Sequence, residues 1–244
     1  YKPQLNGSLM VSSVIEATAP LSRPIAADKA SAASEKLRLP VNKPKTFKAE
    51  RLHKRWGTVI FMSGIHALTI YALLPRFWSW QAFSAFIILY WITACLGVTL
   101  GYHRLLSHRS FQLPKWLERF FATCGALSCQ HGPIDWVGLH RHHHTFSDTD
   151  PDHHDSNKGF WWSHMGWMFE HVPAMDTVPR LAGDLTKDAY YRWLNKYFLL
   201  LQIPLGALLF WIGDISQVGG WSMVLWGIPL RLVFVYHITW LVNS

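Results

Sequence analysis

The sequence is poor in charged residues and in cysteine. Only 16% of its 244 residues are charged, whereas half are hydrophobic and 15% are aromatic, which excludes a chain that is disordered throughout. The three cysteines, Cys95, Cys124 and Cys129, include no CxxC pair, so neither a disulfide framework nor a thiolate zinc site is indicated. Fourteen tryptophans, whose rings suit the boundary between lipid and water, make a membrane protein the leading class.

A basic stripe that would bind nucleic acid is also missing, so no nucleic-acid partner is expected. The formal charge of +8 is concentrated in residues 1–55, which hold eleven bases and four acids, and the rest of the chain is nearly neutral. Residues 1–46 are rich in Ser, Ala and Pro, contain few acids and have no hydrophobic period. We expect residues 1–50 to be a disordered tail, either an ordinary flexible one or a transit peptide, and residues 51–244 to form a membrane domain.

Four apolar segments follow the tail. Residues 56–74 and 80–101 contain no formal charge over nineteen and twenty-two residues, which as helices extend about 28 and 33 Å and can cross a bilayer core. A third segment, 197–212, is short and contains Pro204, but Trp193 and Leu194 can extend it. The fourth, 221–242, contains Arg231 and His237, which either face the protein interior or snorkel, and which are functional candidates at that depth.

The distribution of Lys and Arg predicts the orientation of these segments. The tail holds eleven and the polar stretch 103–196 holds ten, whereas the two short connections contain only Arg76. Because positive charge marks the cytosolic or stromal side, the tail and the polar stretch are expected on that same side. Residues 116–128 look like an interfacial helix. The predicted fold is an all-α integral membrane protein with four transmembrane helices and a histidine-rich cytosolic or stromal cap.

Histidine is concentrated in the polar stretch. Eleven of the fourteen histidines fall between His103 and His171, and neutral imidazole is the commonest metal ligand, suited to iron, zinc and copper. At about 100° per residue, His140, His143 and His144 share one face of a helix, while His142 points about 160° away from His140.

His103 and His108 are five residues apart, about 140° on a regular helix, so they are either splayed across two metals or brought together by unwinding of the helix end. Two metals fit these five ligands better than one.

Three stretches together carry a resemblance to a known family. They are GYHRLLSH at 101–108, HRHHH at 140–144 and GFWWSHMGW at 159–167. Over roughly residues 50–244 the chain resembles the membrane fatty acyl desaturases of the delta-9 type.

The resemblance implies an iron enzyme that inserts a cis double bond into an acyl chain. It implies two irons, O2 as co-substrate, an external electron donor (ferredoxin or cytochrome b5), and a membrane lipid or acyl-CoA substrate. It identifies as metal ligands His103, His108, His140, His143 and His144, with Asn243 reaching the iron through a water. It also implies a multi-pass location in the plastid or endoplasmic reticulum membrane.

One feature of the family is absent. A third histidine box would follow the fourth span, and the sequence stops at Ser244. We therefore expect the chain to be truncated at its C-terminus and not to sustain turnover by itself.

Alternative functions and roles stay open at this stage. A hydroxylase on the same di-iron scaffold, or a membrane metal-binding protein without catalysis, would also use histidine clusters.

The run from Asp150 to Asp155 is expected near the substrate head group or in a loop, with a ligand role less favoured. The remaining histidines are expected to orient ligands, cap helices or pack in the structure: His66, His131, His164 and His171. Three tryptophans either line an acyl tunnel or pack at the membrane interface: Trp161, Trp162 and Trp167.

Overall fold

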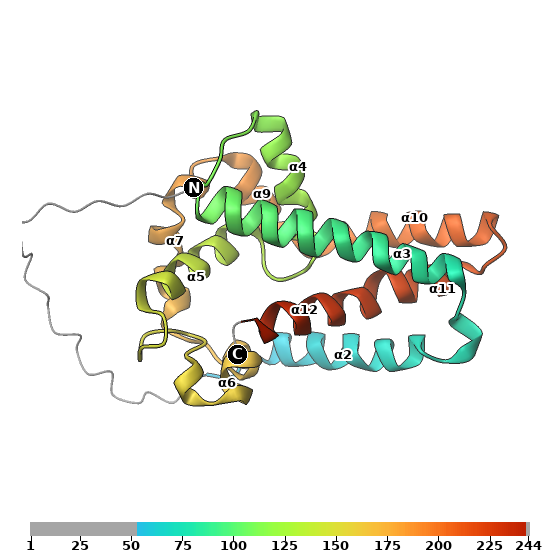
Figure 1. Ribbon diagram of the computed structural model, residues 1–244, viewed down its shortest axis with the longest axis horizontal. Coiled ribbons are helices and arrows are strands. Elements are labelled where there is room, and N and C mark those ends of the chain that lie inside the picture. The colour runs from blue at the N-terminus through green and yellow to red at the C-terminus, as the bar shows by residue number, and fades with distance from the viewer. Residues whose placement is uncertain (1–52, 243–244) are drawn as a thin grey trace, which may run out of the picture. The chain divides into compact units, whose positions relative to one another are not determined.

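The computed structural model describes residues 53–242, and regular structure in this part of the chain is helical (Figure 1). Short 3-10 or π segments are labelled η. The elements in chain order are α2 (Trp56–Ala72), η1 (Pro75–Phe77), α3 (Trp80–Tyr90), η2 (Trp91–Ser107), α4 (Lys115–Ala126), α5 (Pro133–Phe146), η3 (Ser156–Lys158), α6 (Phe160–His164), η4 (Gly166–Phe169), α7 (Ala174–Leu181), α8 (Gly183–Thr186), α9 (Ala189–Tyr197), η5 (Phe198–Leu201), α10 (Gln202–Ile215), α11 (Gly220–Leu225), η6 (Trp226–Leu230) and α12 (Arg231–Leu241). The expected tail at 1–50 and Asn243 lie outside the described residues.

Three continuous helices are long and apolar enough to cross a membrane. They are Trp80–Ser107, Ala189–Ile215 and Gly220–Leu241, with 28, 27 and 22 residues. The helix that contains the third apolar segment begins at Ala189, four residues before Trp193, to which the sequence allowed the segment to extend, because the amphipathic helix α9 leads into it without a break. The first predicted segment forms α2, an apolar helix of 17 residues that is shorter than the other three.

Departures from regular α-helix occur within these long helices. Pro204 has no N–H to give to the turn before it, and the tighter 3-10 segment η5 lies there. Pro229 lies inside η6, where the fourth segment is π-helical. The whole of η2 is also π-helical, with hydrogen bonds that reach five residues back.

The long helices lie along one another, and α4, α5, α7 and α9 gather near the end of η2 (Figure 1). Close packing of α4 against η2 depends on small residues. A Cβ atom at Gly97 would lie 2.4 Å from the carbonyl carbon of Cys124, so only glycine allows this approach. Main-chain hydrogen bonds from Arg55 to Phe169 and from His171 to His53 join the start of α2 to the segment after η4, each at 2.8 Å.

Many outward side chains of the long helices are apolar. Ile70, Ile203 and Ile215 are exposed by 72%, 68% and 60%. Exposed apolar side chains on several neighbouring helices form the kind of surface that a lipid bilayer covers.

Candidate metal centre

Helix α5 carries three of the five histidines expected as ligands, and its start is held by a distant side chain. Pro133 occupies its first turn, where a missing N–H is tolerated. The side-chain oxygen of Asn195, in α9, accepts hydrogen bonds from the N–H groups of Ile134 and Asp135 at 2.9 and 3.0 Å. Asn195 therefore caps α5 and fixes the direction in which its histidines project.

The end of η2 carries the other two histidines, and its π-helical geometry resolves their five-residue spacing. The N–H of His108 donates to the carbonyl of His103 at 3.0 Å, a bond that spans five residues. The two side chains consequently lie on the same side, with their Nε2 atoms 3.1 Å apart. Of the two arrangements predicted for this pair, the structure has the one in which the helix departs from α geometry.

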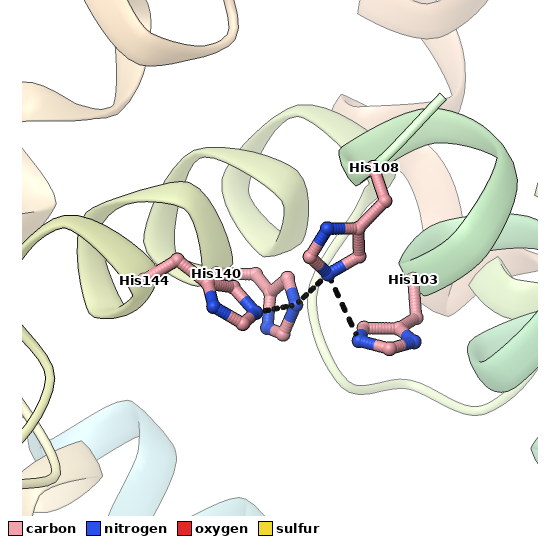
Figure 2. A group of neighbouring side chains, drawn as sticks. All are labelled: His103, His108, His140 and His144. Atoms are coloured by element: carbon pink, nitrogen blue, oxygen red, sulfur yellow. Dashed lines mark hydrogen bonds between the residues drawn. The ribbon is translucent and has the colours of Figure 1, made fainter. Parts of the chain in front are cut away.

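Four imidazoles from η2 and α5 converge in one cluster (Figure 2). The Nε2 atom of His140 lies 3.2 Å from that of His108 and 3.0 Å from that of His144. Two nitrogens that bind one metal at about 2.1 Å, at an angle of about 90° to 110°, lie roughly 3.0 to 3.4 Å apart. The cluster, which we call the four-histidine group (His103, His108, His140 and His144), therefore fits a single metal ion.

His143 lies in a second group with Asp152 and His154, whose potential ligand atoms lie within 4.8 Å of one another. The Nδ1 atom of His143 donates to the Oδ2 atom of Asp152 at 2.8 Å. A histidine that donates one ring hydrogen to a carboxylate presents its other nitrogen in the form that binds a metal. His154 packs against His143 with ring centroids 4.0 Å apart, so this second group has donors for another metal ion.

Electrostatics favour the neutral form of two of these imidazoles, His140 and His154. Burial, followed by the charge repulsion of neighbouring imidazoles, lowers the pKa of His140 to about 2. Burial and His143 lower the pKa of His154 to about 4. For Asp152, burial acts to raise the pKa, but hydrogen bonds from His143 and from the main chain outweigh it and hold the pKa below its usual range. Neutral imidazole and ionised carboxylate are the metal-binding forms of these side chains.

The two histidine-bearing elements are tied together by Arg141. Its guanidinium donates to the carbonyl of Leu106 at 2.7 Å and to that of Ser107 at 3.4 Å, just before His108 in the chain. It also pairs with Asp184 in α8 at 2.7 Å, and Arg109 pairs with the same carboxylate. Arg141 thus fixes α5 relative to the end of η2.

His142 has a different environment from its neighbours. It is buried, its ring packs against Phe146 with centroids 4.8 Å apart, and it belongs to neither group of potential ligands. This placement is the one expected for a residue on the opposite face of α5.

A cavity of about 410 Å³ lies beside the two groups. His140, His153 and His154 form part of its wall, and the remaining lining is mainly apolar, with Phe61, Met62, Trp136, Leu139, Trp167, Met168, Phe198, Leu199, Tyr236 and Trp240. Among the lining side chains, Arg55 and Asp135 are those with a formal charge. Trp167 lines the cavity, whereas Trp161 is exposed by 64%.

Three further histidines form a line across three elements. The Nδ1 atom of His66 donates to the carbonyl of Met62 at 2.7 Å, so its Nε2 atom accepts from His237 at 3.0 Å. The other ring nitrogen of His237 then accepts from Nε2 of His164, also at 3.0 Å. This line joins α2, α12 and α6.

The other two histidines singled out in the sequence lie apart from this line. His131 lines the cavity, and His171 pairs with Asp176 at 3.2 Å on the surface.

The structure brings Asp152 and His154 next to His143, a contact that the sequence did not predict. The run from Asp150 to Asp155 follows α5 in a loop, as expected, but residues 152–155 in it are buried. Two adjacent histidines and alternating aspartates soon after a histidine box were the available signal. The ring of His154 reaches His143 only because the loop folds back onto α5, and no helical period predicts that contact.

Comparison with known proteins gives one matching family. Residues 77–244 match the family model described as fatty acid desaturase. An sn-1 stearoyl-lipid 9-desaturase of Anabaena variabilis is 54% identical over 189 residues, which are 78% of this chain and 67% of that protein.

Two further curated relatives have related names. An sn-1 stearoyl-lipid 9-desaturase of Synechocystis sp. is 50% identical, over 80% of this chain and 59% of that protein. A chloroplastic palmitoyl-monogalactosyldiacylglycerol delta-7 desaturase of Arabidopsis thaliana is 44% identical, over 78% of this chain and 49% of that protein. The chain spans between about half and two thirds of the length of these three relatives.

Proposed function

This chain belongs to the fatty acid desaturase family, and we propose that the gene product that carries it inserts a cis double bond, of the delta-9 type, into an acyl chain. The observation that carries the proposal is the position of two groups of metal-binding side chains beside one largely apolar cavity. A saturated methylene offers no acid or base site, so its oxidation needs a cofactor.

The cofactor that suits these residues is a pair of iron ions. The four-histidine group has the nitrogen spacing for one ion, and His143 with His154 and Asp152 has donors for the other. When bound, two irons supply the activation of O2 that removes hydrogen from an unactivated methylene. The site residues proposed as ligands are His103, His108, His140, His143 and His144, to which His154 is now added as a candidate, while Asp152 orients His143.

The chain's own residues hold the substrate and keep the reaction dry. The apolar lining of the cavity, including Trp136 and Trp167, excludes water and fits an alkyl chain. His140 is both a proposed ligand and part of the cavity wall, so an acyl chain in the cavity passes directly beside the metal site. The position of the new double bond then depends on which methylene the cavity walls place there.

The cavity lining suits an acyl chain of a membrane lipid better than it suits acyl-CoA. Coenzyme A carries several phosphate charges, which proteins bind with clusters of Arg and Lys. The lining has Arg55 as its cation, and Asp135 lies close enough to interact with it electrostatically. A neutral glycolipid head group needs no such cluster, and the three relatives described above are named as desaturases of lipid-bound acyl chains.

The membrane arrangement proposed is four spans, with α2 as the first. The three longer helices satisfy the length of a bilayer core, and 17 residues of α2 reach about 26 Å, close to the approximately 30 Å of hydrocarbon. The excess of Lys and Arg in the tail sequence and in residues 103–196 supports a cytosolic or stromal side for both. The membrane is that of a plastid, with ferredoxin as the electron donor, or that of the endoplasmic reticulum, with cytochrome b5 as the donor.

The experiment that tests the proposal combines metal analysis with lipid profiling. We expect the gene product, purified in detergent, to bind close to two irons per chain, and we expect cells that produce it to gain cis-unsaturated acyl chains in their membrane lipids. Hydroxylated acyl chains would instead support a hydroxylase. Bound zinc without any change in lipid composition would favour a non-catalytic metal-binding protein and overturn the proposal.

A further inference from the structure

Arg231 is a buried cation within the fourth apolar helix. It has no exposed surface, so it does not snorkel to the membrane boundary, and of the two roles open at the sequence level the structure has the interior one. A guanidinium in an apolar environment is costly unless its N–H groups are hydrogen-bonded, and such residues are functional candidates.

Three neutral oxygen atoms from different elements surround this guanidinium. Its Nε atom donates to the carbonyl of Gly227 at 2.8 Å, one terminal nitrogen donates to the carbonyl of Leu127 at 3.0 Å, and the other donates to Oε1 of Gln202 at 3.1 Å. The amide of Gln202 donates in turn to the same Leu127 carbonyl at 3.1 Å. Arg231 thereby links the third and fourth apolar helices to the end of α4.

Leu127 begins a loop that passes between the long helices, and we call residues 127–131 the cavity loop. Cys129 and His131 have φ angles of 57° and 74°, a left-handed conformation that residues other than glycine seldom adopt. The hydroxyl of Tyr236 donates to the carbonyl of Cys129 at 2.7 Å, and the amide of Gln130 donates to the carbonyl of Val235 at 3.4 Å. One side of the fourth helix therefore holds the loop at several points.

The cavity loop contributes three neighbouring residues to the cavity wall: Cys129, Gln130 and His131. Arg231 itself does not line the cavity, so it acts on the cavity contents through the loop. An unusual backbone conformation persists only where the surroundings impose it. Tyr236 holds the carbonyl of Cys129 itself, and Arg231 holds the start of the loop at Leu127.

We propose that Arg231 is a positioning residue that sets the wall of the acyl cavity, and thereby the carbon atom at which the double bond is introduced. The inference rests on the proposed function, because it concerns where an acyl chain lies relative to the metal site. Without the guanidinium, the amide of Gln202 is the remaining side-chain donor to the carbonyl of Leu127. The cavity loop is then free to relax toward ordinary backbone angles. The wall moves, and the acyl chain shifts along the cavity.

The test compares Arg231→Met and Arg231→Lys with the unaltered gene product, in cells that lack a desaturase of their own. Double-bond positions are read by mass spectrometry of the membrane acyl chains, and iron content is read on purified protein. Since a displacement of about 1 Å can cost on the order of 100-fold in rate, we expect Arg231→Met to change the ratio of positional isomers by roughly 10-fold while iron content is retained. Lysine has one charged nitrogen for three acceptors, so Arg231→Lys should change the ratio less. Arg76→Met, which removes an exposed arginine far along the chain from the cavity loop, is the control and should leave the ratio unchanged.

A second variant covers the case in which Arg231→Met does not accumulate in the membrane. Tyr236→Phe removes only the hydroxyl that holds Cys129, and it should shift the isomer ratio in the same direction. Variants with reduced total activity but with the isomer ratio of the unaltered protein would assign Arg231 a purely structural role and overturn this proposal alone. An unaltered protein that makes no unsaturated chains would overturn the proposed function, and this inference with it.

Discussion

Arg141 forms an ion pair with Asp184 at 2.7 Å while it donates to the carbonyl of Leu106 at the end of the helix that carries His103 and His108. A single side chain thus holds the two histidine-bearing elements in register. The pair is only partly exposed, so water screens it less than a surface ion pair.

Substitution of Arg141 should therefore weaken metal binding without preventing folding. We expect Arg141→Gln to lower iron affinity by roughly 10 to 100-fold, the usual loss when a group that orients ligands is removed. Asp184→Asn should lower it less, because the carbonyl contacts of Arg141 remain. Arg109→Gln is the matched control, since Arg109 shares the same carboxylate but is 63% exposed. Full iron content in Arg141→Gln, measured on folded protein, would contradict the idea that this residue sets the ligand register.

The same ion pair predicts a pH dependence of stability. Burial acts to raise the pKa of Asp184, but hydrogen bonds from Arg141 and Arg109 outweigh it and lower the pKa to about 2, from an ordinary value of 3.8. A carboxyl whose pKa is lower in the folded state contributes stability above its unfolded pKa and loses it as the pH falls through the folded value. The melting temperature of the unaltered protein should exceed that of Asp184→Asn above about pH 4, and the difference should vanish near pH 2. A difference that is constant across this range would argue against the ion pair.

Neighbouring histidines in α5 should respond very differently to substitution. We expect His143→Ala to lose one iron and all desaturation, because it removes a proposed ligand. His142→Ala should retain both irons and most activity, at some cost in stability, because His142 is buried on the other side of the helix. Asp152→Asn should fall between the two, since the amide is a poorer partner for the ring hydrogen of His143. Equal losses of iron from His142→Ala and His143→Ala would refute the division of α5 into two faces.

Close packing between η2 and α4 can be tested with two glycines. Gly97→Ala should destabilise the protein by about 1 to 3 kcal/mol or more, because the new Cβ would overlap the backbone of Cys124, which cannot move like a flexible side chain. Gly64→Ala is the control, because nothing lies within 4 Å of a Cβ at that position. Alanine also favours a helix over glycine by about 1 kcal/mol, so Gly64→Ala should be neutral or slightly stabilising. Thermal unfolding in detergent distinguishes the two, and equal melting temperatures would show that the contact at Gly97 is not tight.

The four-span arrangement predicts which segments share a side of the membrane. Tags placed before Trp56 and near Lys158 should be accessible from the same side, because segments rich in Lys and Arg are expected on the cytosolic or stromal side. A tag at Gly219, in the connection between α10 and α11, should report the opposite side. Labelling of Lys158 and Gly219 from one side would rule out this topology.

Much of the architecture follows from local sequence alone. Long uncharged runs have few alternatives to helix in an apolar environment, so the positions of the long helices were largely predictable. The exceptions are the end of the second helix, which runs on to Ser107, and the early start of the third. The period of 3.6 residues separated His142 from the other histidines of α5, because that relation is internal to one helix. The motifs at 101–108 and 140–144 likewise indicated the fatty acid desaturase family from the sequence alone.

Tertiary structure alone decided how residues distant in the chain meet. Three contacts join segments whose approach depends on packing and not on the helical period of either segment. His143 pairs with Asp152, Asn195 caps α5, and Arg231 donates to the carbonyl of Leu127. The meeting of His103 and His108 required η2 to leave α geometry, which the surrounding helices stabilise and the local sequence does not dictate. The kinds of side chain that could bind a metal are therefore a property of the sequence. Their grouping and the shape of the cavity arise only when the helices pack, because each distance depends on two backbones at once.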